Sequence, residues 1–272
     1  MRTLPLSAVT AALDTLAPLR HAAAWDNVGL LVEPVTGASV AHVHLTIDLT
    51  EPVLAEAMGA GADLVVAYHP PIFGGQKRLT QDLAHQRVLL QAIRAGVALY
   101  SPHTAADAAA GGVNDWLLDG LGRFSGRRPI EPADEDGEPV AGGVGMGRIG
   151  LLDEAAELGA LVDRLKAYLG LAHLRVAASA RHDGGEPVER VAVCPGAGGS
   201  LFEELVGPDL FVTGEMRHHD VLSKVAAGAS VILTEHSNCE RGWLLTLAER
   251  LREATGLRVT VSEIDRDPLA IR

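Results

Sequence analysis

Short apolar runs of strand length alternate along the chain with amphipathic segments of helical length, and this alternation constrains the fold more than any other feature. Strands are predicted within residues 41–48, 63–71, 97–103, 147–152, 174–179, 188–194, 208–215, 229–236 and 257–265. Helices are predicted over residues 7–19, 50–62, 81–96, 111–122 and 153–170, with Ser7 and Thr50 as N-caps of the first two. Such a sequence predicts an α/β architecture whose sheets are mixed and largely parallel.

Two segments, residues 45–70 and 191–219, repeat one order of strand, turn, helix, Asp-Leu, strand and His. Between them, residues 127–145 are rich in Pro, Gly and acidic side chains, which is typical of a linker or an exposed loop. We therefore expect two similar α/β lobes. One is predicted to be discontinuous and to comprise residues 1–126 with 230–272, and the other to comprise residues 127–229.

Polar side chains with metal-ligand chemistry follow four of the predicted strands. They are His69, His103 with Asp107, His218 with His219, and His236 with Glu240. Ligands of open α/β sheets bind outside the carboxyl ends of the strands, so neighbouring parallel strands would bring these residues together. Imidazole and carboxylate donors suit zinc, manganese or iron. Two such ions, bridged by a carboxylate such as Asp107 or Glu240, can activate water for hydrolysis.

Each of these residues also has an ordinary structural interpretation. His236 and Glu240, four residues apart, share a face only if a helix begins near Ser237. The structural alternatives are a hydrogen-bonded His69, Asp107 as a helix cap, Glu240 in a surface ion pair with Arg241, and His218 and His219 as a polar helix start. The recurrence of His at four strand ends favours a shared site over these separate explanations.

Three further features stay open. Cys239 lies between His236 and Glu240 and could be a nucleophile of lowered pKa, although no oxyanion-hole pattern accompanies it. The Gly-rich segment 194–200 is either a tight turn or an anion-binding loop. Trp25, Asp26 and Asn27 either form a simple turn or line the site.

Composition limits the partners. The formal net charge of −12 argues against a nucleic-acid-binding surface. Two cysteines give no disulfide framework and indicate a reducing compartment. The first residues lack the apolar core of a signal peptide, and no segment has the length of a membrane span, so we expect a cytoplasmic protein.

With these residues identified, the sequence resembles the NGG-interacting-factor-like dinuclear metal-centre proteins, often labelled GTP cyclohydrolase 1 type 2 homologs. The matching segments are "WDNVGLLV", "LVVAYHPPIF", "YSPHTAADAAAGGVNDWL", "VTGEMRHHDVL" and "LTEHSNCERGWL". They occur in the family's order between residues 25 and 244. The combination is specific, although no single segment would be.

The resemblance implies two α/β lobes with two divalent metal ions at the C-terminal strand ends between them, in subunits that assemble as toroidal hexamers. Carried over by position, the metal ligands would be His69, Asp107, His236 and Glu240. Many members have two adjacent His ligands where this chain has Tyr68 and His69. A neutral phenol is a poor zinc ligand, so the second ion has one nitrogen donor fewer.

The leading hypothesis is a metal-dependent hydrolase that acts on a small polar substrate such as a nucleotide. His103 or His219 is the candidate proton-transfer group. The alternative is a metal-binding scaffold or interaction protein without turnover. A shortage of protein ligands for two ions favours the open, catalytic kind of site.

Overall fold

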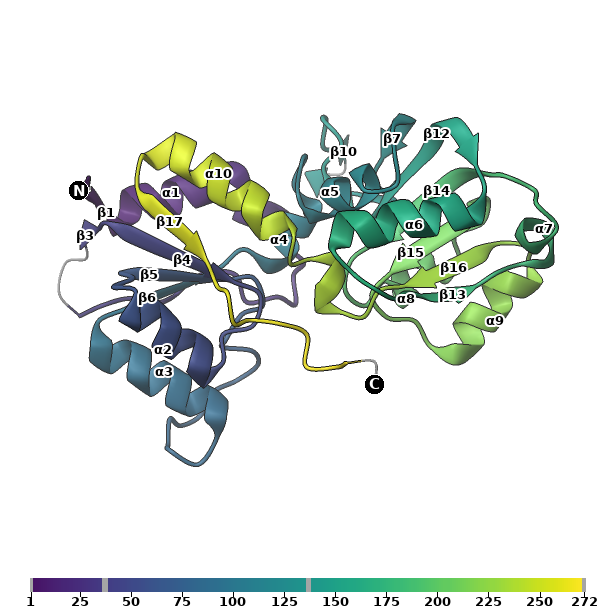
Figure 1. The fold of residues 1–272 in the computed structure, drawn as a ribbon. Helices are drawn as coiled ribbons and strands as arrows, with labels where there is room; N and C mark the ends of the chain where they lie inside the picture. The colour runs from purple at the N-terminus through teal and green to yellow at the C-terminus, as the bar shows by residue number, and fades with distance from the viewer. Residues whose placement is uncertain (1, 36–38, 136–137, 271–272) are drawn as a thin grey trace. The chain divides into compact units, whose positions relative to one another are not determined.

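The computed structural model describes residues 2–35, 39–135 and 138–270 (Figure 1). The chain divides into two compact units, which are described separately below. Unit 1 comprises residues 1–106 and 243–266, and unit 2 comprises residues 107–242 and 267–272. The sequence had suggested boundaries near 126 and 230. The structure differs because the strand at Ser230–Leu233 is hydrogen-bonded inside the sheet of unit 2, so the chain leaves that unit only after it.

Unit 1 is built on a five-stranded sheet of order β17-β4-β5-β6-β2. Strands β17, β4, β5 and β6 are parallel, and β2 is antiparallel to β6 at the edge. Its strands are β1 (Leu4–Pro5), β2 (Gly29–Val32), β3 (Ser39–Val40), β4 (His42–Thr46), β5 (Leu64–Ala67), β6 (Ala98–Ser101) and β17 (Arg258–Val261). Its helices are α1 (Leu6–Leu16), η1 (Leu19–His21), α2 (Glu51–Gly59), α3 (Ala84–Ala95) and α10 (Trp243–Thr255), and α4 (His103–Ala108) ends at the boundary with unit 2.

Helices cover both faces of this sheet, with α1 and α10 on one side and α2 and α3 on the other (Figure 1). Strands β4, β5 and β6 are accordingly buried along their whole length. The apolar faces of α2 and α3 pack on Val65 and Leu99 through Leu54, Leu89 and neighbouring residues. Full burial on both faces explains why these strands read as continuous apolar runs in the sequence.

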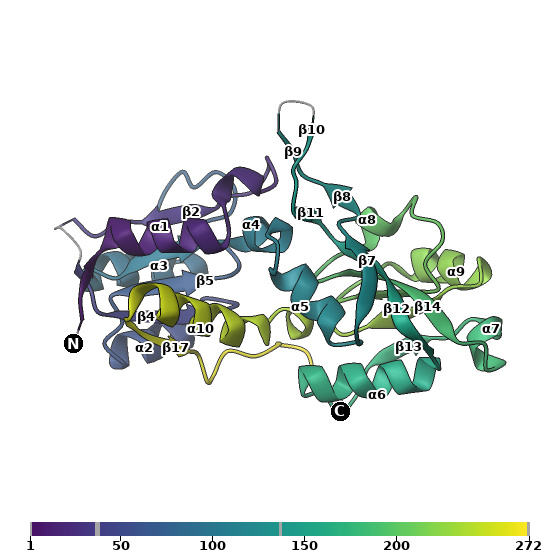
Figure 2. The ribbon, with the colours of Figure 1, turned by 90° about the horizontal axis from the view of Figure 1, so that it is seen from above.

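Unit 2 is built on a six-stranded sheet of order β13-β16-β15-β14-β12-β7, in which β14, β15 and β16 are parallel. Its main strands are β7 (Phe124–Arg128), β12 (Arg148–Ala156), β13 (Arg175–Ala177), β14 (Val188–Cys194), β15 (Leu210–Thr213) and β16 (Ser230–Leu233). Its helices are α5 (Val113–Asp119), α6 (Leu158–Leu169), α7 (Ala180–Asp183), α8 (Gly199–Phe202), α9 (His218–Ala226) and η2 (Ser237–Cys239). Figure 2 shows α6 on one side of this sheet and α8 and α9 on the other.

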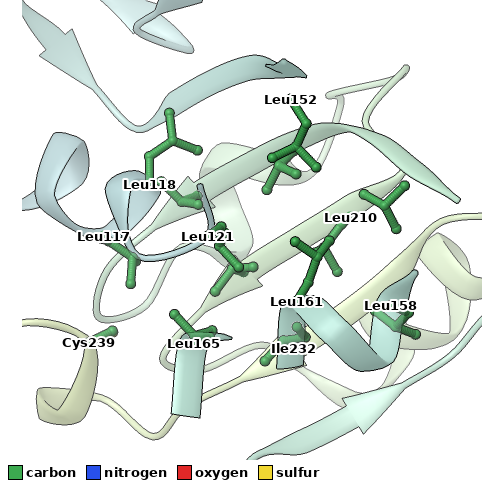
Figure 3. Packing of buried hydrophobic residues seen from close by; sticks show 14 residues of the cluster. Leu117, Leu118, Leu121, Leu152, Leu158, Leu161, Leu165, Leu210, Ile232 and Cys239 are labelled. Carbon is green, nitrogen blue, oxygen red and sulfur yellow. The ribbon is translucent and has the colours of Figure 1, made fainter. Parts of the chain in front are cut away.

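The core of unit 2 follows from the alternation of side chains along its strands. Leu210 and Val212 face the leucines of α5 and α6, whereas Phe211 between them faces α8 and α9. Figure 3 shows the first of these clusters, in which leucines from the two helices converge on the strands. Each fully buried leucine contributes roughly 1.5–3 kcal/mol, so this face is a major source of the stability of the unit.

Three local expectations are corrected by the structure. The helix expected from residue 153 begins at Leu158, because β12 continues to Ala156 in pairing with β14. Ser7 is not the N-cap of α1, which begins at Leu6 after Pro5. Residues 127–145 do not link the units but lie within unit 2, in short pairs formed by β8 (Glu131–Pro132), β9 (Asp134–Glu135), β10 (Glu138–Pro139) and β11 (Gly145–Met146).

Within the described part of the chain, the helices are all too short or too polar to cross a bilayer.

Candidate metal centre

In unit 1, the carboxyl ends of three neighbouring parallel strands carry Asp48, His69 and His103. The amide of His69 donates a hydrogen bond to the Ile47 carbonyl at 3.1 Å, which joins the end of β5 to that of β4. The Ser101 hydroxyl donates to the Tyr68 carbonyl at 2.8 Å, which joins the ends of β5 and β6. Parallel pairing therefore brings His69 and His103 to one edge of the sheet, and their ring centroids are 5.4 Å apart.

Both of these histidines use the same ring nitrogen to contact a carboxylate. His69 Nδ1 lies 2.9 Å from Asp48 Oδ1, and His103 Nδ1 lies 2.8 Å from the carboxylate of Asp26. A carboxylate at Nδ1 fixes the ring orientation and the tautomer in which Nε2 is the basic nitrogen. Metal-binding histidines in proteins are typically held in this way.

Asp26 is a buried anchor rather than a simple turn residue. Its side chain is fully buried, and it also accepts hydrogen bonds from the amide and hydroxyl of Thr104. Burial alone would raise the pKa of Asp26, but the hydrogen bonds from His103 and Thr104 outweigh it and lower the pKa to about 2. Asp26 therefore stays ionised beside His103. His103 itself has a φ of +24°, a sparsely populated conformation of the kind that concentrates at functional sites.

Tyr68 occupies the position at which the family resemblance implies a second histidine. Its side chain is buried, and its ring packs against His69 and His103 at centroid distances of 5.1 and 5.6 Å. A third contact, at 6.4 Å, is with Trp243 of α10. Tyr68 thus supports both imidazoles by packing against them and does not supply a nitrogen donor.

In unit 2, His236 and Glu240 lie beyond the end of β16. Their facing atoms, His236 Nε2 and Glu240 Oε1, are 3.7 Å apart, close enough to contact one ion together. The turn that brings them together is the 3-10 helix η2, which begins at Ser237 and so meets the condition for the two side chains to share a face. On its other side, His236 Nδ1 lies 2.8 Å from Glu215 Oε1, at the end of β15. This is the third histidine with a carboxylate at Nδ1.

The Gly-rich turn after β14 is part of this arrangement. Gly196 has a φ of +63°, and a Cβ placed on it would lie 2.7 Å from Glu240 Oε1 and 3.2 Å from His236 Nε2. Its carbonyl accepts hydrogen bonds from the Glu215 amide at 2.9 Å and the Thr213 hydroxyl at 3.1 Å. The turn therefore places backbone, without a side chain, against the facing atoms of His236 and Glu240. These features favour the tight-turn interpretation, because they account for Gly196 without a bound anion.

The surroundings of Cys239 count against its interpretation as a nucleophile. The thiol is completely buried, and its sulfur accepts a hydrogen bond from the Gly196 amide at 3.3 Å. Burial raises the pKa of Cys239 to about 12, and the carboxylate of Glu240 adds to the effect. A thiol of that pKa is protonated near neutral pH and is a poor nucleophile. Cys239 supports the turn that carries Gly196.

Glu240 and Asp107 also depart from their ordinary structural interpretations. Glu240 is 2% exposed, so it is not a surface partner of Arg241. Asp107 is near the end of α4, and the N-cap position of α5 is Gly112, so Asp107 is not a helix cap. Burial raises the pKa of Cys194 well above its ordinary value, and the carboxylates of Asp107 and Glu240 contribute.

His218 and His219 are in a different setting. They begin α9 and are exposed, with ring centroids 5.5 Å apart. This is the polar helix start that their sequence context allowed. A proton-transfer role for His219 stays a prediction.

Sequence reasoning missed Asp48 and Glu215, the carboxylates that orient His69 and His236. Both follow strands directly, Asp48 after "HLTI" and Glu215 after "FVTG". The strand-end argument that selected the histidines applies equally to them.

Comparison with known proteins identifies the family of this chain. The family model described as Duf34/NIF3 (NGG1p interacting factor 3) matches residues 4–268. The chain is 42% identical to the protein NIF3 homolog of Schizosaccharomyces pombe, over 90% of each chain. It is 41% identical to NIF3-like protein 1 of Drosophila melanogaster, over 97% of this chain and 88% of that protein. The chain belongs to the Duf34/NIF3 family.

The fold agrees with that of solved relatives of this NIF3 chain. A Bacillus cereus protein related to NIF3 superposes with a TM-score of 0.86 over the full length of both chains, at 20% identity. The two-lobed α/β fold expected from the sequence is therefore confirmed.

The donors present in this NIF3 chain suit a divalent metal. Nitrogen and carboxylate oxygen atoms are the ligands that zinc, manganese and iron accept, and both types meet at His236 and Glu240. The carboxylate at each Nδ1 is the support that such ligands require. Beside Glu215, a cavity of about 520 Å³ opens between Ala197 of the turn, Ser200 of α8 and the start of α9 at Arg217 and Asp220. It offers room for a small polar molecule beside Glu215, the carboxylate that contacts His236 Nδ1.

Proposed function

We propose that this NIF3 chain is a divalent-metal-dependent hydrolase whose metal ligands are His69, Asp107, His236 and Glu240. The observation that carries the proposal is the repeated support of His69, His103 and His236, each with a carboxylate at Nδ1. One such pair is common in proteins as a structural hydrogen bond. Three at strand ends, two of them on expected ligands, favour a metal centre.

A bound divalent ion would lower the pKa of a water molecule and stabilise negative charge that develops on the substrate. The protein residues supply the setting for this chemistry. Asp48 and Glu215 hold the rings of His69 and His236 in a fixed orientation and tautomer. The turn at Gly196 keeps side-chain atoms away from the facing atoms of His236 and Glu240. Tyr68 packs against the rings of His69 and His103 and offers no nitrogen donor itself.

His103 is the candidate for proton transfer. It is partly exposed, and its Nδ1 lies 2.8 Å from the buried carboxylate of Asp26, which holds the ring in a fixed orientation. A histidine paired with a carboxylate in this way can accept a proton and pass it on. His219 is the second candidate, and the two are separated by comparing His103→Ala with His219→Ala in the same assay.

The substrate we propose is a small polar molecule such as a nucleotide, and the assembly a homohexamer, both as implied by the family resemblance. Light scattering after size-exclusion chromatography measures the assembly directly. Zinc, manganese and iron are the candidate ions, and the second ion is expected to bind more weakly because Tyr68 stands where the family resemblance implies a second histidine ligand.

The central experiment compares metal content and hydrolysis in the same preparations. Protein stripped with a chelator is reloaded with zinc or manganese, and bound metal is measured by atomic emission. The variants are His69→Ala from unit 1 and His236→Ala, Glu240→Ala and Asp107→Ala from unit 2. His85→Ala, on the exposed side of α3, is the matched control. Hydrolysis is followed with GTP and with p-nitrophenyl phosphate.

We expect each of the four variants, but not His85→Ala, to lose bound metal and hydrolysis together. Unchanged metal content in His236→Ala and Glu240→Ala would exclude the proposed centre. Metal loss in the unit 2 variants alone would exclude His69 as a ligand. Metal binding by the parent protein without turnover would instead favour a metal-binding scaffold.

A further inference from the structure

Two large aromatic side chains of unit 1, Trp25 and Phe73, are exposed in a chain that has few aromatic residues. Trp25 is 66% exposed and Phe73 is 58% exposed. Their ring centroids are 6.2 Å apart and their planes meet at 74°, an edge-to-face arrangement. Aromatic rings contribute most to stability or binding when they are buried. A pair of rings held together in water therefore indicates a surface that a ligand covers.

Trp25 is held in place by the residues on both sides of it. The buried carboxylate of Asp26 bonds to His103 and Thr104, and the Thr104 hydroxyl also accepts a hydrogen bond from the Ala23 amide at 3.0 Å. The side-chain amide of Asn27 donates to the Ile72 carbonyl at 2.7 Å, directly before Phe73. The two loops are thus tied to each other. Exposure of the rings is therefore a fixed feature of the fold.

The pair borders the histidines at the strand ends of unit 1. The Trp25 and His103 ring centroids are 6.0 Å apart at an interplanar angle of 76°. The ring of His69 lies on from His103, with 5.4 Å between their centroids. A group resting on Trp25 would lie beside the ring proposed for proton transfer. The position of the pair suits the binding of part of a substrate rather than contact with a distant partner.

We propose that Trp25 and Phe73 form a stacking platform for a planar heteroaromatic ring, such as a nucleobase, carried by the substrate. The inference rests on the proposed function, and it deepens it by naming the part of the substrate that this loop pair recognises. Both rings are more than half exposed, so a stacked ring keeps its edges toward water. This arrangement suits a ring with polar edge groups better than an aliphatic group, which would need an enclosed pocket.

The test measures binding without turnover, in chelator-treated protein, so that it does not depend on metal or hydrolysis. GMP and AMP are the probes, and ribose 5-phosphate, which lacks the base, is the comparison ligand. Affinities are measured by isothermal titration calorimetry, with tryptophan fluorescence quenching as a second readout in the parent protein. The variants are Trp25→Leu, Phe73→Leu and the conservative Trp25→Phe. The control is Ile93→Ala, an exposed apolar side chain on α3.

We expect GMP and AMP to bind and ribose 5-phosphate to bind far more weakly. Trp25→Leu should weaken GMP binding by roughly 5- to 150-fold, the range of base stacking on one aromatic side chain, and Phe73→Leu should weaken it less. Trp25→Phe should recover part of the affinity, and Ile93→Ala should leave it unchanged.

Equal GMP affinity in Trp25→Leu and the parent protein, or no saturable GMP binding to the parent, would overturn the platform. A changed oligomeric state in Trp25→Leu with unchanged GMP affinity would assign the pair to a contact between subunits and would also overturn it. Base-dependent binding by the chelator-treated protein, together with no hydrolysis by the metal-reloaded protein, would support the platform and reject the hydrolase. The failure of one proposal is therefore distinguishable from the failure of the other.

Discussion

His236 contacts a carboxylate on each side of its ring, with Nδ1 2.8 Å from Glu215 Oε1 and Nε2 3.7 Å from Glu240 Oε1. The two contacts have different settings. Glu215 is exposed on the loop after β15, whereas Glu240 is buried. In the proposed centre, Glu215 is therefore the carboxylate that orients the ring, and Glu240 the one that would share an ion with it.

The first prediction concerns Glu215. Glu215→Gln keeps the size of the side chain but removes the charge that fixes the His236 tautomer, so we expect affinity for zinc to fall about 10- to 100-fold with little loss of stability. Zinc affinity is measured by competition with a chromophoric chelator, and stability by thermal unfolding of the metal-free protein. Glu189→Gln, an exposed carboxylate on β14, is the control. Equal zinc affinity in the two variants would count against an orienting role for Glu215.

The second prediction concerns the left-handed glycine of the turn. Gly196→Ala places a methyl group 2.7 Å from Glu240 Oε1, whereas Gly170→Ala, at a similar φ of +68°, meets no atom within 4 Å. Both substitutions should cost about 1–3 kcal/mol of stability from backbone strain. Only Gly196→Ala should also displace Glu240 and weaken metal binding.

Urea unfolding and metal titration of both glycine variants separate the two effects. A Gly196→Ala protein that bound metal as tightly as Gly170→Ala would show that the close approach of backbone to Glu240 is irrelevant to the centre.

The third prediction concerns the buried thiol. Because Cys239 is buried and its pKa is raised to about 12, iodoacetamide should alkylate it in native protein at pH 8 far more slowly than in urea. Cys239→Ala should keep metal and any hydrolysis, at a cost of about 1–3 kcal/mol for the Gly196 amide that loses its acceptor. Mass spectrometry follows the alkylation. Loss of hydrolysis in a folded, metal-replete Cys239→Ala protein would restore the nucleophile interpretation.

The convergence of His69 and His103 could be predicted because parallel strands place their ends at one edge. "DLVVAYHP" and "VALYSPH" are apolar runs that end in polar residues, and the pairing of β5 with β6 does bring His69 and His103 together. Gly196 could not be predicted, because its role depends on the contact between the turn after β14 and a loop forty residues later. The extent of β12 was missed for a related reason. Residues 153–156 have helical propensity, but pairing with β14 overrides it.

The fourth prediction concerns two buried histidines of β4 that have no part in the proposed centre. His42 Nε2 and His44 Nδ1 lie 2.7 and 2.9 Å from the Thr260 hydroxyl of β17. Burial lowers the pKa of both residues below the ordinary 6.5, with Arg258 adding to the effect at His42 and Glu56 opposing it at His44. Burial therefore favours the neutral form of both histidines in the folded protein.

The sign of the resulting pH dependence follows from proton uptake. Below about pH 6.5 the unfolded chain binds protons at these positions that the folded chain does not, so stability is complete above that pH and falls as the pH drops below it. His44→Gln removes one of these groups and should reduce the difference in unfolding midpoint between pH 8 and pH 5.5. His85→Gln, exposed on α3, should leave that difference unchanged. Urea unfolding at the two pH values measures it, and an undiminished difference in His44→Gln would show that acid destabilisation arises elsewhere.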